Sequence, residues 1–187
     1  MKQKLVLRNI LLACGAFLLV AAFAFSFLIR GNVVTGSDSM MYYSGAIWGA
    51  SKVTTVSGGS TSTSTIAEDR IYVPVAAMIG FILMAVAGVA AVVLKLIIKK
   101  EKTERLALVL TAVVALVGAA LSFIPMNLAL HCYAMETNVS LDHAKEMWDV
   151  LLGWKERVSF LHIVLSAVGV VGAGLIGVAG VIKAKKK

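Results

Sequence analysis

Four stretches of this 187-residue chain contain no lysine, arginine, aspartate or glutamate. They are residues 10–29, 71–94, 106–135 and 158–182. Each is at least as long as the roughly 20 apolar residues that an α-helix needs to cross the hydrocarbon core of a membrane. Since backbone N–H and C=O groups must find partners within the chain in lipid, runs of this length predict helices. We therefore predict four transmembrane helices.

The overall composition agrees with a membrane protein. Charged residues make up only 15% of the chain, whereas a soluble domain carries about 25%. We predict an all-α membrane protein with a single integral membrane domain over residues 1–187, in which a four-helix bundle carries a small cap outside the cytoplasm. The predicted spans cover residues 7–29, 71–95, 106–132 and 158–182.

The basic residues are divided unevenly between the two sides of the predicted bundle. Twelve of the 18 lie near the N-terminus, at residues 95–105 and near the C-terminus, and six lie in the two longer loops. Cytoplasmic segments collect lysine and arginine. We therefore predict a plasma-membrane protein, most simply a bacterial one, with both termini and the 96–105 loop in the cytoplasm and with outer loops at 30–70 and 133–157.

The same charge pattern bears on two further points. The pI of about 9.7 follows from this topology, and no nucleic-acid partner is expected, because basic residues are not interleaved with aromatic residues on one face. We also expect the first span to remain as a membrane helix, since its removal as a signal peptide would leave three spans and spoil the charge division.

The first outer loop contains β-branched segments on both sides of Gly58-Gly59. Residues 53–56 read VTTV and residues 61–66 read TSTSTI, and a glycine pair between such runs is typical of a β-hairpin turn. A flexible Ser/Thr linker is the alternative. Upstream, MMYYSGAIWGA at 40–50 predicts either an interfacial aromatic belt or an exposed contact patch. The candidate contact residues are Tyr42, Tyr43 and Trp48.

The second outer loop contains a short amphipathic helix according to its apolar spacing. Leu141, Ala144, Trp148 and Leu151 recur at helical intervals. Ser140 is suited to the N-cap position. We expect this helix to lie at the membrane surface with its tryptophans among the headgroups.

Residues 131–149 and His162 bring together several side chains that can bind metals. His131, His143, Glu146 and His162 are the candidate ligands, but no spacing such as H-x-x-x-H or C-x-x-C occurs. We therefore expect no metal, no haem or other cofactor, and no enzymatic activity. The alternative is a membrane metal or haem enzyme that uses His131 and His162. The only cysteines are Cys14 and Cys132, so no disulfide framework holds the loops.

Small residues recur at intervals of four in the predicted spans. This spacing lets helix backbones approach closely and favours helix packing, either within the bundle or with a second membrane protein. The candidate packing residues are Gly169, Ala173 and Gly177 in the fourth span, and Ala76 and Gly80 in the second.

The order of segments also resembles a known layout. Four spans, cytoplasmic termini, a larger β-containing first outer loop and a shorter second loop are combined with GAIWG at 45–49 and with Arg70 directly before the second span. This layout resembles that of the claudin-type tetraspan proteins.

The function expected from these features is that of a non-enzymatic scaffold, accessory subunit or contact protein that acts through its outer loops. The expected partners are membrane lipid and either further copies of the chain or another membrane protein. The alternatives are a small-solute or ion transporter or channel formed by oligomerisation, and the metal or haem enzyme.

Overall fold

The computed structural model describes residues 2–183 and divides them into two compact units. The helix unit comprises residues 2–25, 79–123 and 164–183, and the sheet unit comprises residues 26–78 and 124–163. The range predicted as a single domain therefore contains two units. Lysines 185–187, which contributed to the predicted charge division, lie outside the described residues.

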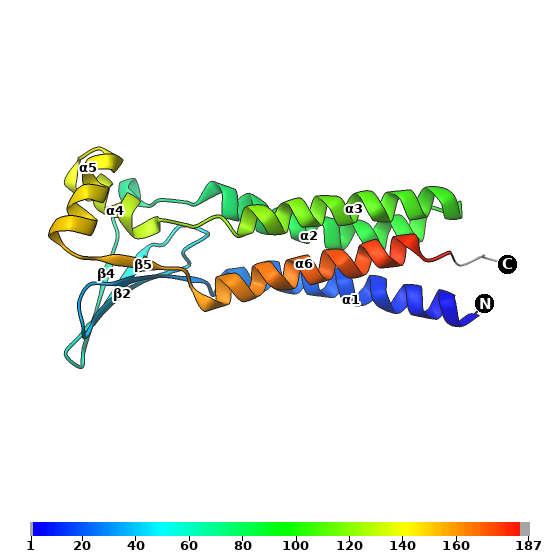
Figure 1. The fold of residues 1–187 in the computed structure, drawn as a ribbon, viewed down its shortest axis with the longest axis horizontal. Coiled ribbons are helices and arrows are strands. Elements are labelled where there is room, and N and C mark those ends of the chain that lie inside the picture. The colour runs from blue at the N-terminus through cyan, green and yellow to red at the C-terminus, as the bar shows by residue number, and fades with distance from the viewer. Residues whose placement is uncertain (1, 184–187) are drawn as a thin grey trace. The chain divides into compact units, whose positions relative to one another are not determined.

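Within residues 2–183, four helices are long and apolar enough to cross a membrane, which indicates a membrane protein with four candidate spans (Figure 1). Each arises from a charge-poor stretch of the sequence, as predicted. Their bounds are Lys2–Ser26 (α1), Val75–Ile97 (α2), Glu101–Ser122 (α3) and Phe160–Val181 (α6).

Neighbouring helices of the helix unit are antiparallel and touch through glycine. The close contacts are Gly15 with Gly172 (α1–α6), Gly88 with Ala16 (α1–α2), Gly80 with Ser122 (α2–α3), and Gly180 with Arg105 (α3–α6). A Cβ atom added to the first-named glycine of each pair would lie 2.5–3.2 Å from a backbone oxygen or nitrogen of the facing helix. The four helices therefore form a closed ring in which small residues allow backbone contact.

The third apolar stretch is divided into two helices. α3 ends at Ser122, and a separate helix, α4, runs over Leu128–Thr137. Pro125 lacks an N–H group and disfavours helical backbone in the residue before it, and Asn127 has a left-handed φ of 41°. The third span is therefore shorter than the predicted 106–132, and α4 belongs to the sheet unit.

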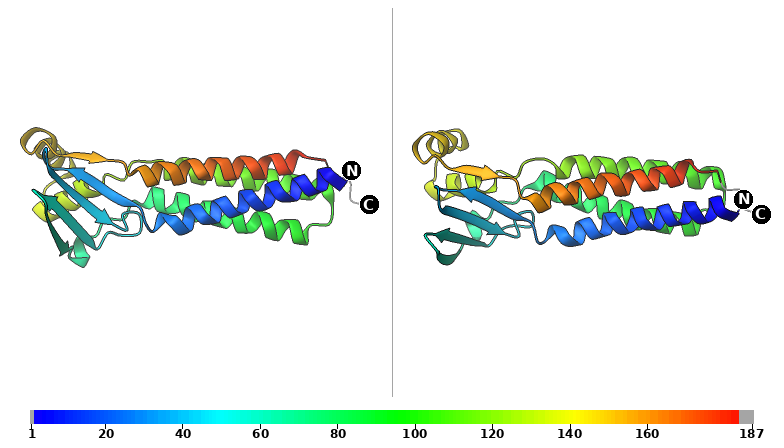
Figure 2. Two further views of the ribbon diagram at one scale, coloured as in Figure 1. Left: turned by 90° about the horizontal axis from the view of Figure 1, so that it is seen from below. Right: turned by 60° about the horizontal axis from the view of Figure 1, so that its bottom comes forward.

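The sheet unit contains one five-stranded antiparallel sheet in the order β4-β3-β2-β1-β5. In Figure 2, β1 and β5 run side by side although they come from distant parts of the chain. The presence of this sheet corrects our prediction of an all-α fold. The strand bounds are Arg30–Val34 (β1), Ser39–Ser44 (β2), Lys52–Ser57 (β3), Ser60–Thr65 (β4) and Lys155–Arg157 (β5).

The β-hairpin predicted in the first long loop is present. β3 and β4 pair from Lys52↔Thr65 to Ser57↔Ser60. Gly58 and Gly59 connect them with φ values of 55° and 81°. A two-residue hairpin turn with positive φ at both positions strongly favours glycine, which explains this pair.

The second long loop contains α4, α5 (Leu141–Glu146) and the π-helix η2 (Met147–Leu151). The predicted N-cap is present, because the Ser140 hydroxyl accepts the His143 backbone N–H. Trp148 is only 3% exposed, and its ring contacts those of Trp154 and Tyr133 at 4.8 and 5.5 Å. Trp148 is therefore a core residue, which corrects the expectation that it lies among lipid headgroups, whereas Trp154 is half-buried.

The contact between α2 and α3 gives a direct test of the ring. We expect Gly80→Ala to lower stability by about 1–3 kcal/mol, the usual cost of overpacking, because the added Cβ would lie 2.5 Å from the Ser122 nitrogen. Gly174→Ala is the matched control, since nothing lies within 4 Å of its added Cβ. Unfolding midpoints in detergent would decide, and equal midpoints for both variants would contradict the close contact.

Candidate functional site

The structure does not bring the three predicted contact residues together. Tyr42 and Tyr43 are neighbours on β2, so their side chains point to opposite faces of the sheet. Tyr43 is buried, whereas Tyr42 is half-buried. Trp48 lies in the loop after β2, where its ring stacks on Phe27 at 4.6 Å and its indole N–H donates to the Ser26 hydroxyl. Only Tyr42 therefore lies on the open face of the sheet described below.

One face of the sheet is covered by α4. A Cβ atom added to Gly31 on β1 would lie 3.2 Å from Leu128 of that helix. Val33 and Tyr43 lie on the same face and are buried. Burial, with smaller contributions from Cys132 and Glu156, raises the pKa of Tyr43 well above its usual value. Its phenol therefore stays neutral and serves as packing.

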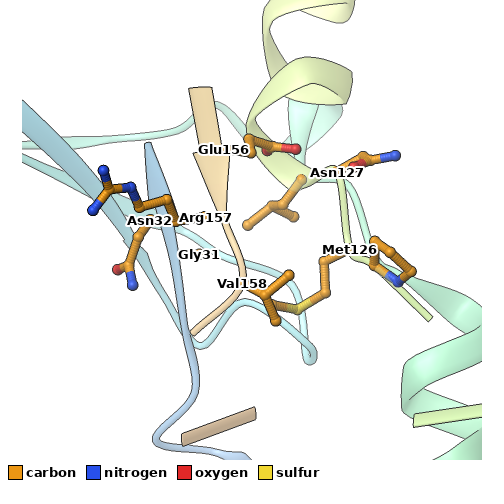
Figure 3. A pocket seen from close by; sticks show the side chains of 9 residues that line it. Gly31, Asn32, Met126, Asn127, Glu156, Arg157 and Val158 are labelled. Carbon is orange, nitrogen blue, oxygen red and sulfur yellow. The ribbon is translucent and has the colours of Figure 1, made fainter. Parts of the chain in front are cut away.

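Glu156 on β5 points from this covered face to the first turn of α4. Its Oε1 atom accepts the backbone N–H groups of Ala129 and Leu130, which have no partner within the helix. Burial raises the pKa of this carboxyl, although the two N–H donors act in the opposite direction. Figure 3 shows Glu156 directed towards Asn127, with Arg157 and Asn32 on the other side of the strands.

A pocket of about 210 Å³ lies beside this cap within the sheet unit. Its one acidic side chain is Glu156, whose Oε1 already holds the start of α4. The other lining residues include no second acid, and their one basic side chain is that of Arg157. They are Gly31, Asn32, Pro125, Met126, Asn127, Leu128, Arg157 and Val158. The pocket therefore combines one acidic and one basic side chain with otherwise neutral lining residues.

The opposite face of the sheet is uncovered, and we call it the basic face. Its members follow from the strand register, because paired residues lie on the same side of a sheet. They are Arg30, Asn32, Val34, Met40, Tyr42, Ser44, Lys52, Thr54, Val56, Thr61, Thr63, Thr65, Lys155 and Arg157. Every member is exposed or half-buried.

The basic face carries four cations and, among its members, no acid. Arg30, Lys52, Lys155 and Arg157 are all exposed, and the Arg30 guanidinium lies 5.9 Å from the centre of the Tyr42 ring. Thr54 and Thr63 place their hydroxyl oxygens 3.2 Å apart between strands. Positive charge and hydrogen-bonding groups therefore share one open, sheet-sized surface.

The acids of the sheet unit lie elsewhere. Glu136 lies 3.7 Å from Arg70 in an exposed ion pair between α4 and the 3-10 helix η1 (Glu68–Arg70). Asp142, Glu146 and Asp149 are exposed on α5 and η2. These acids therefore lie outside the basic face.

The candidate metal ligands do not form a site within residues 2–183. No group of three or more His, Cys, Asp or Glu side chains in that part of the chain could hold a metal ion. The His131 ring stacks on Tyr72 at 3.9 Å, and its Nδ1 lies 2.8 Å from the Asn127 carbonyl oxygen. His143 and Glu146 are exposed, whereas His162 is buried.

Neither cysteine belongs to a disulfide. Cys132 is buried in α4, and burial raises the pKa of its thiol. A thiol that resists deprotonation is a poor nucleophile, so this cysteine is suited to packing.

The predicted helix-packing residues differ in how closely they are packed. A Cβ atom added to Gly169 would collide with the Met84 sulfur, whereas one added to Gly177 would make an ordinary 3.5 Å contact with Ala112. Ala173 is fully buried, and Gly80 contacts α3 directly. Ala76 is half-buried at the start of α2.

The helix unit also contains an ionic cluster that sequence reasoning missed. Glu104 Oε1 lies 3.1 Å from an Arg8 guanidinium nitrogen and 2.6 Å from Lys95 Nζ. Arg8 also donates to the Ala179 carbonyl, so the cluster joins all four helices. Glu104 was assigned to a cytoplasmic loop, but its spacing from Leu108 matches the buried side of α3. That spacing was the sequence signal that could have identified Glu104 as a buried residue.

Comparison with known proteins gives no family. No protein-family model matches this chain, and no curated protein is significantly similar to it. The resemblance to the claudin-type layout therefore rests on the order of segments, on GAIWG and on Arg70. Within GAIWG, Gly45 and Gly49 have positive φ values of 70° and 94°, and Ala46 and Ile47 are fully buried. The segment is a packed turn.

The role of Glu156 can be tested through pH. Since its pKa in the folded chain is raised above the usual 4.5, folding favours the protonated form. Its contribution to stability is therefore largest below pH 4.5 and decreases as the pH rises through the raised pKa. Glu156→Gln keeps an acceptor for both N–H groups but does not titrate, so we expect this part of the pH dependence of the unfolding midpoint to disappear.

A second variant separates titration from hydrogen bonding. Glu156→Ala leaves the N–H groups of Ala129 and Leu130 without their acceptor, which should cost about 1–3 kcal/mol at any pH. If Glu156→Gln and Glu156→Ala gave the same midpoints across the pH range, the capping role would be refuted.

Proposed function

We propose that this protein is a non-enzymatic contact protein of a plasma membrane, most simply a bacterial one. Both termini lie in the cytoplasm, and the sheet unit lies outside. Its basic face binds an acidic surface of a partner protein. The observation that carries this proposal is the collection of Arg30, Lys52, Lys155 and Arg157 on one uncovered side of the sheet.

The rest of the basic face fits a protein partner. Val34, Met40 and Val56 occupy one paired row across three strands, and Tyr42 lies in the next row. A mixture of apolar, aromatic and cationic groups is typical of protein interfaces, in which tyrosine, methionine and arginine are enriched. Complementary charge gives such an interface its orientation and specificity.

A second candidate, transport of an ion or small solute, has one observation in its favour. Charged residues inside a helical membrane protein often mark ion or proton paths, and Arg8, Lys95 and Glu104 form such a cluster. These residues lie at one end of their helices, and the charge-free stretches provide no charge further along. The cluster therefore supports this candidate less than the basic face supports a contact function.

Reversal of charge on the basic face tests the proposed function. We expect the protein to migrate as a higher-mass complex after extraction from native membranes. Lys52→Glu combined with Arg157→Glu should abolish that complex, because two attractive contacts become repulsive. Ser62→Glu is the control, since it adds negative charge at an exposed position of β4 on the other side of the sheet. Native electrophoresis after mild detergent extraction provides the measurement. A complex that survives the double reversal would refute the proposal.

The orientation has its own test. Twelve of the 18 basic residues belong to the predicted cytoplasmic side, so a cysteine that replaces Lys99 should be protected from an impermeant maleimide in intact cells. A cysteine that replaces Thr63 on β4 should react. The opposite labelling pattern would show that the sheet unit faces the cytoplasm.

A further inference from the structure

The surface that best matches the basic face belongs to this chain itself. α5 and η2 form one short exposed segment, residues 141–151, which we call the acidic segment. It carries the acids Asp142, Glu146 and Asp149 against one cation, Lys145, and all four side chains are exposed. The acidic segment therefore offers negative charge, which complements the positive charge of the basic face.

The acidic segment also carries exposed apolar side chains. Val150 is 74% exposed and Leu151 is 70% exposed, next in sequence to Asp149. On the basic face, Val34, Met40 and Val56 lie side by side in one row, and neighbouring strands are separated by about 4.8 Å. Lys155 continues this row at one end, and Arg157 lies in the next row. Both surfaces therefore combine an apolar strip with charges, and the charges have opposite sign.

Within one copy these two surfaces cannot meet. Asp142 and Asp149 line a pocket together with Leu130 of α4 and Glu156, and these two residues belong to the covered side of the sheet. The basic face lies on the other side. The complementary surfaces of one sheet unit therefore point in different directions.

We propose that the partner bound by the basic face is a second copy of this chain, which docks its acidic segment there. This inference rests on the proposed function and identifies its partner. Because two different surfaces meet, the contact is heterologous. It forms a ring if the rotation between copies closes, and otherwise a row with one basic face and one acidic segment open at its ends. The sheet unit contains six basic and eight acidic residues, so the attraction depends on how the charges face each other.

Cysteine cross-linking tests the predicted pairing in the full-length chain. In a Cys14→Ser, Cys132→Ser background, Thr63→Cys marks the basic face, and His143→Cys marks the acidic segment. When chains with different tags are expressed together, we expect a short bismaleimide to link Thr63→Cys to His143→Cys. Pairing of Thr63→Cys with itself should be at background level. Preferential Thr63→Cys self-pairing would overturn the heterologous contact.

A charge exchange gives the second arm of the test. Lys52→Glu with Arg157→Glu in one chain should lower the cross-link yield roughly tenfold or more, because like charges at an interface cost several kcal/mol. A partner chain that carries Asp142→Lys and Glu146→Lys should restore the yield. Restoration also shows that the reversed chain is folded. Failure of rescue between chains whose unfolding midpoints equal that of the wild type would overturn the proposal.

The outcomes separate this inference from the proposed function. If Lys52→Glu with Arg157→Glu removes a complex that contains another acidic protein and no second copy, the basic face binds a partner but the self-association is wrong. If no complex responds to these changes, both are wrong. Loss of the cross-link at high ionic strength supports the charged contact, since salt screens exposed charges.

Discussion

Direct backbone contact between helices is the constraint on which this structure depends. Lipid tails are as apolar as leucine, so burial of apolar side chains does not by itself hold membrane helices together, and close van der Waals contact has to do so. Gly15, Gly80, Gly88 and Gly180 provide one such contact for each neighbouring pair. The closed antiparallel ring brings the chain out at the same end after α1 and after α3. For this reason two separate connections, residues 27–74 and 123–159, can contribute strands to one sheet.

Elements with a local sequence pattern could be predicted. Elements that depend on pairing between distant parts of the chain could not. The four spans follow from charge-free length, and the β3–β4 hairpin follows from β-branched residues around two glycines. β5 has only three residues, and it pairs with β1 more than 100 positions earlier, so no local signal reveals it. The break before α4 was underestimated because Pro125 can also be accommodated inside a membrane helix.

The candidate site was less accessible to sequence reasoning than the fold. Tyr42 and Tyr43 were grouped by their nearness along the chain, but the alternation of a strand places them on opposite faces. The basic face exists only once the register of five strands is known, since its four cations come from β1, β3 and β5. Glu104 was assigned to a loop because it lies among lysines, although it continues the buried side of α3.

The ionic cluster has a consequence for how the chain assembles during its synthesis. α2 and α3 are separated by only three residues, 98–100, so Lys95 can neutralise Glu104 as soon as the third helix enters the membrane. Arg8, made much earlier, has both Glu104 and the Ala179 carbonyl as partners, and Ala179 is the last of these to emerge. Until then the Arg8 guanidinium lacks its α6 acceptor. The first helix therefore reaches its final arrangement only when the last helix has been inserted.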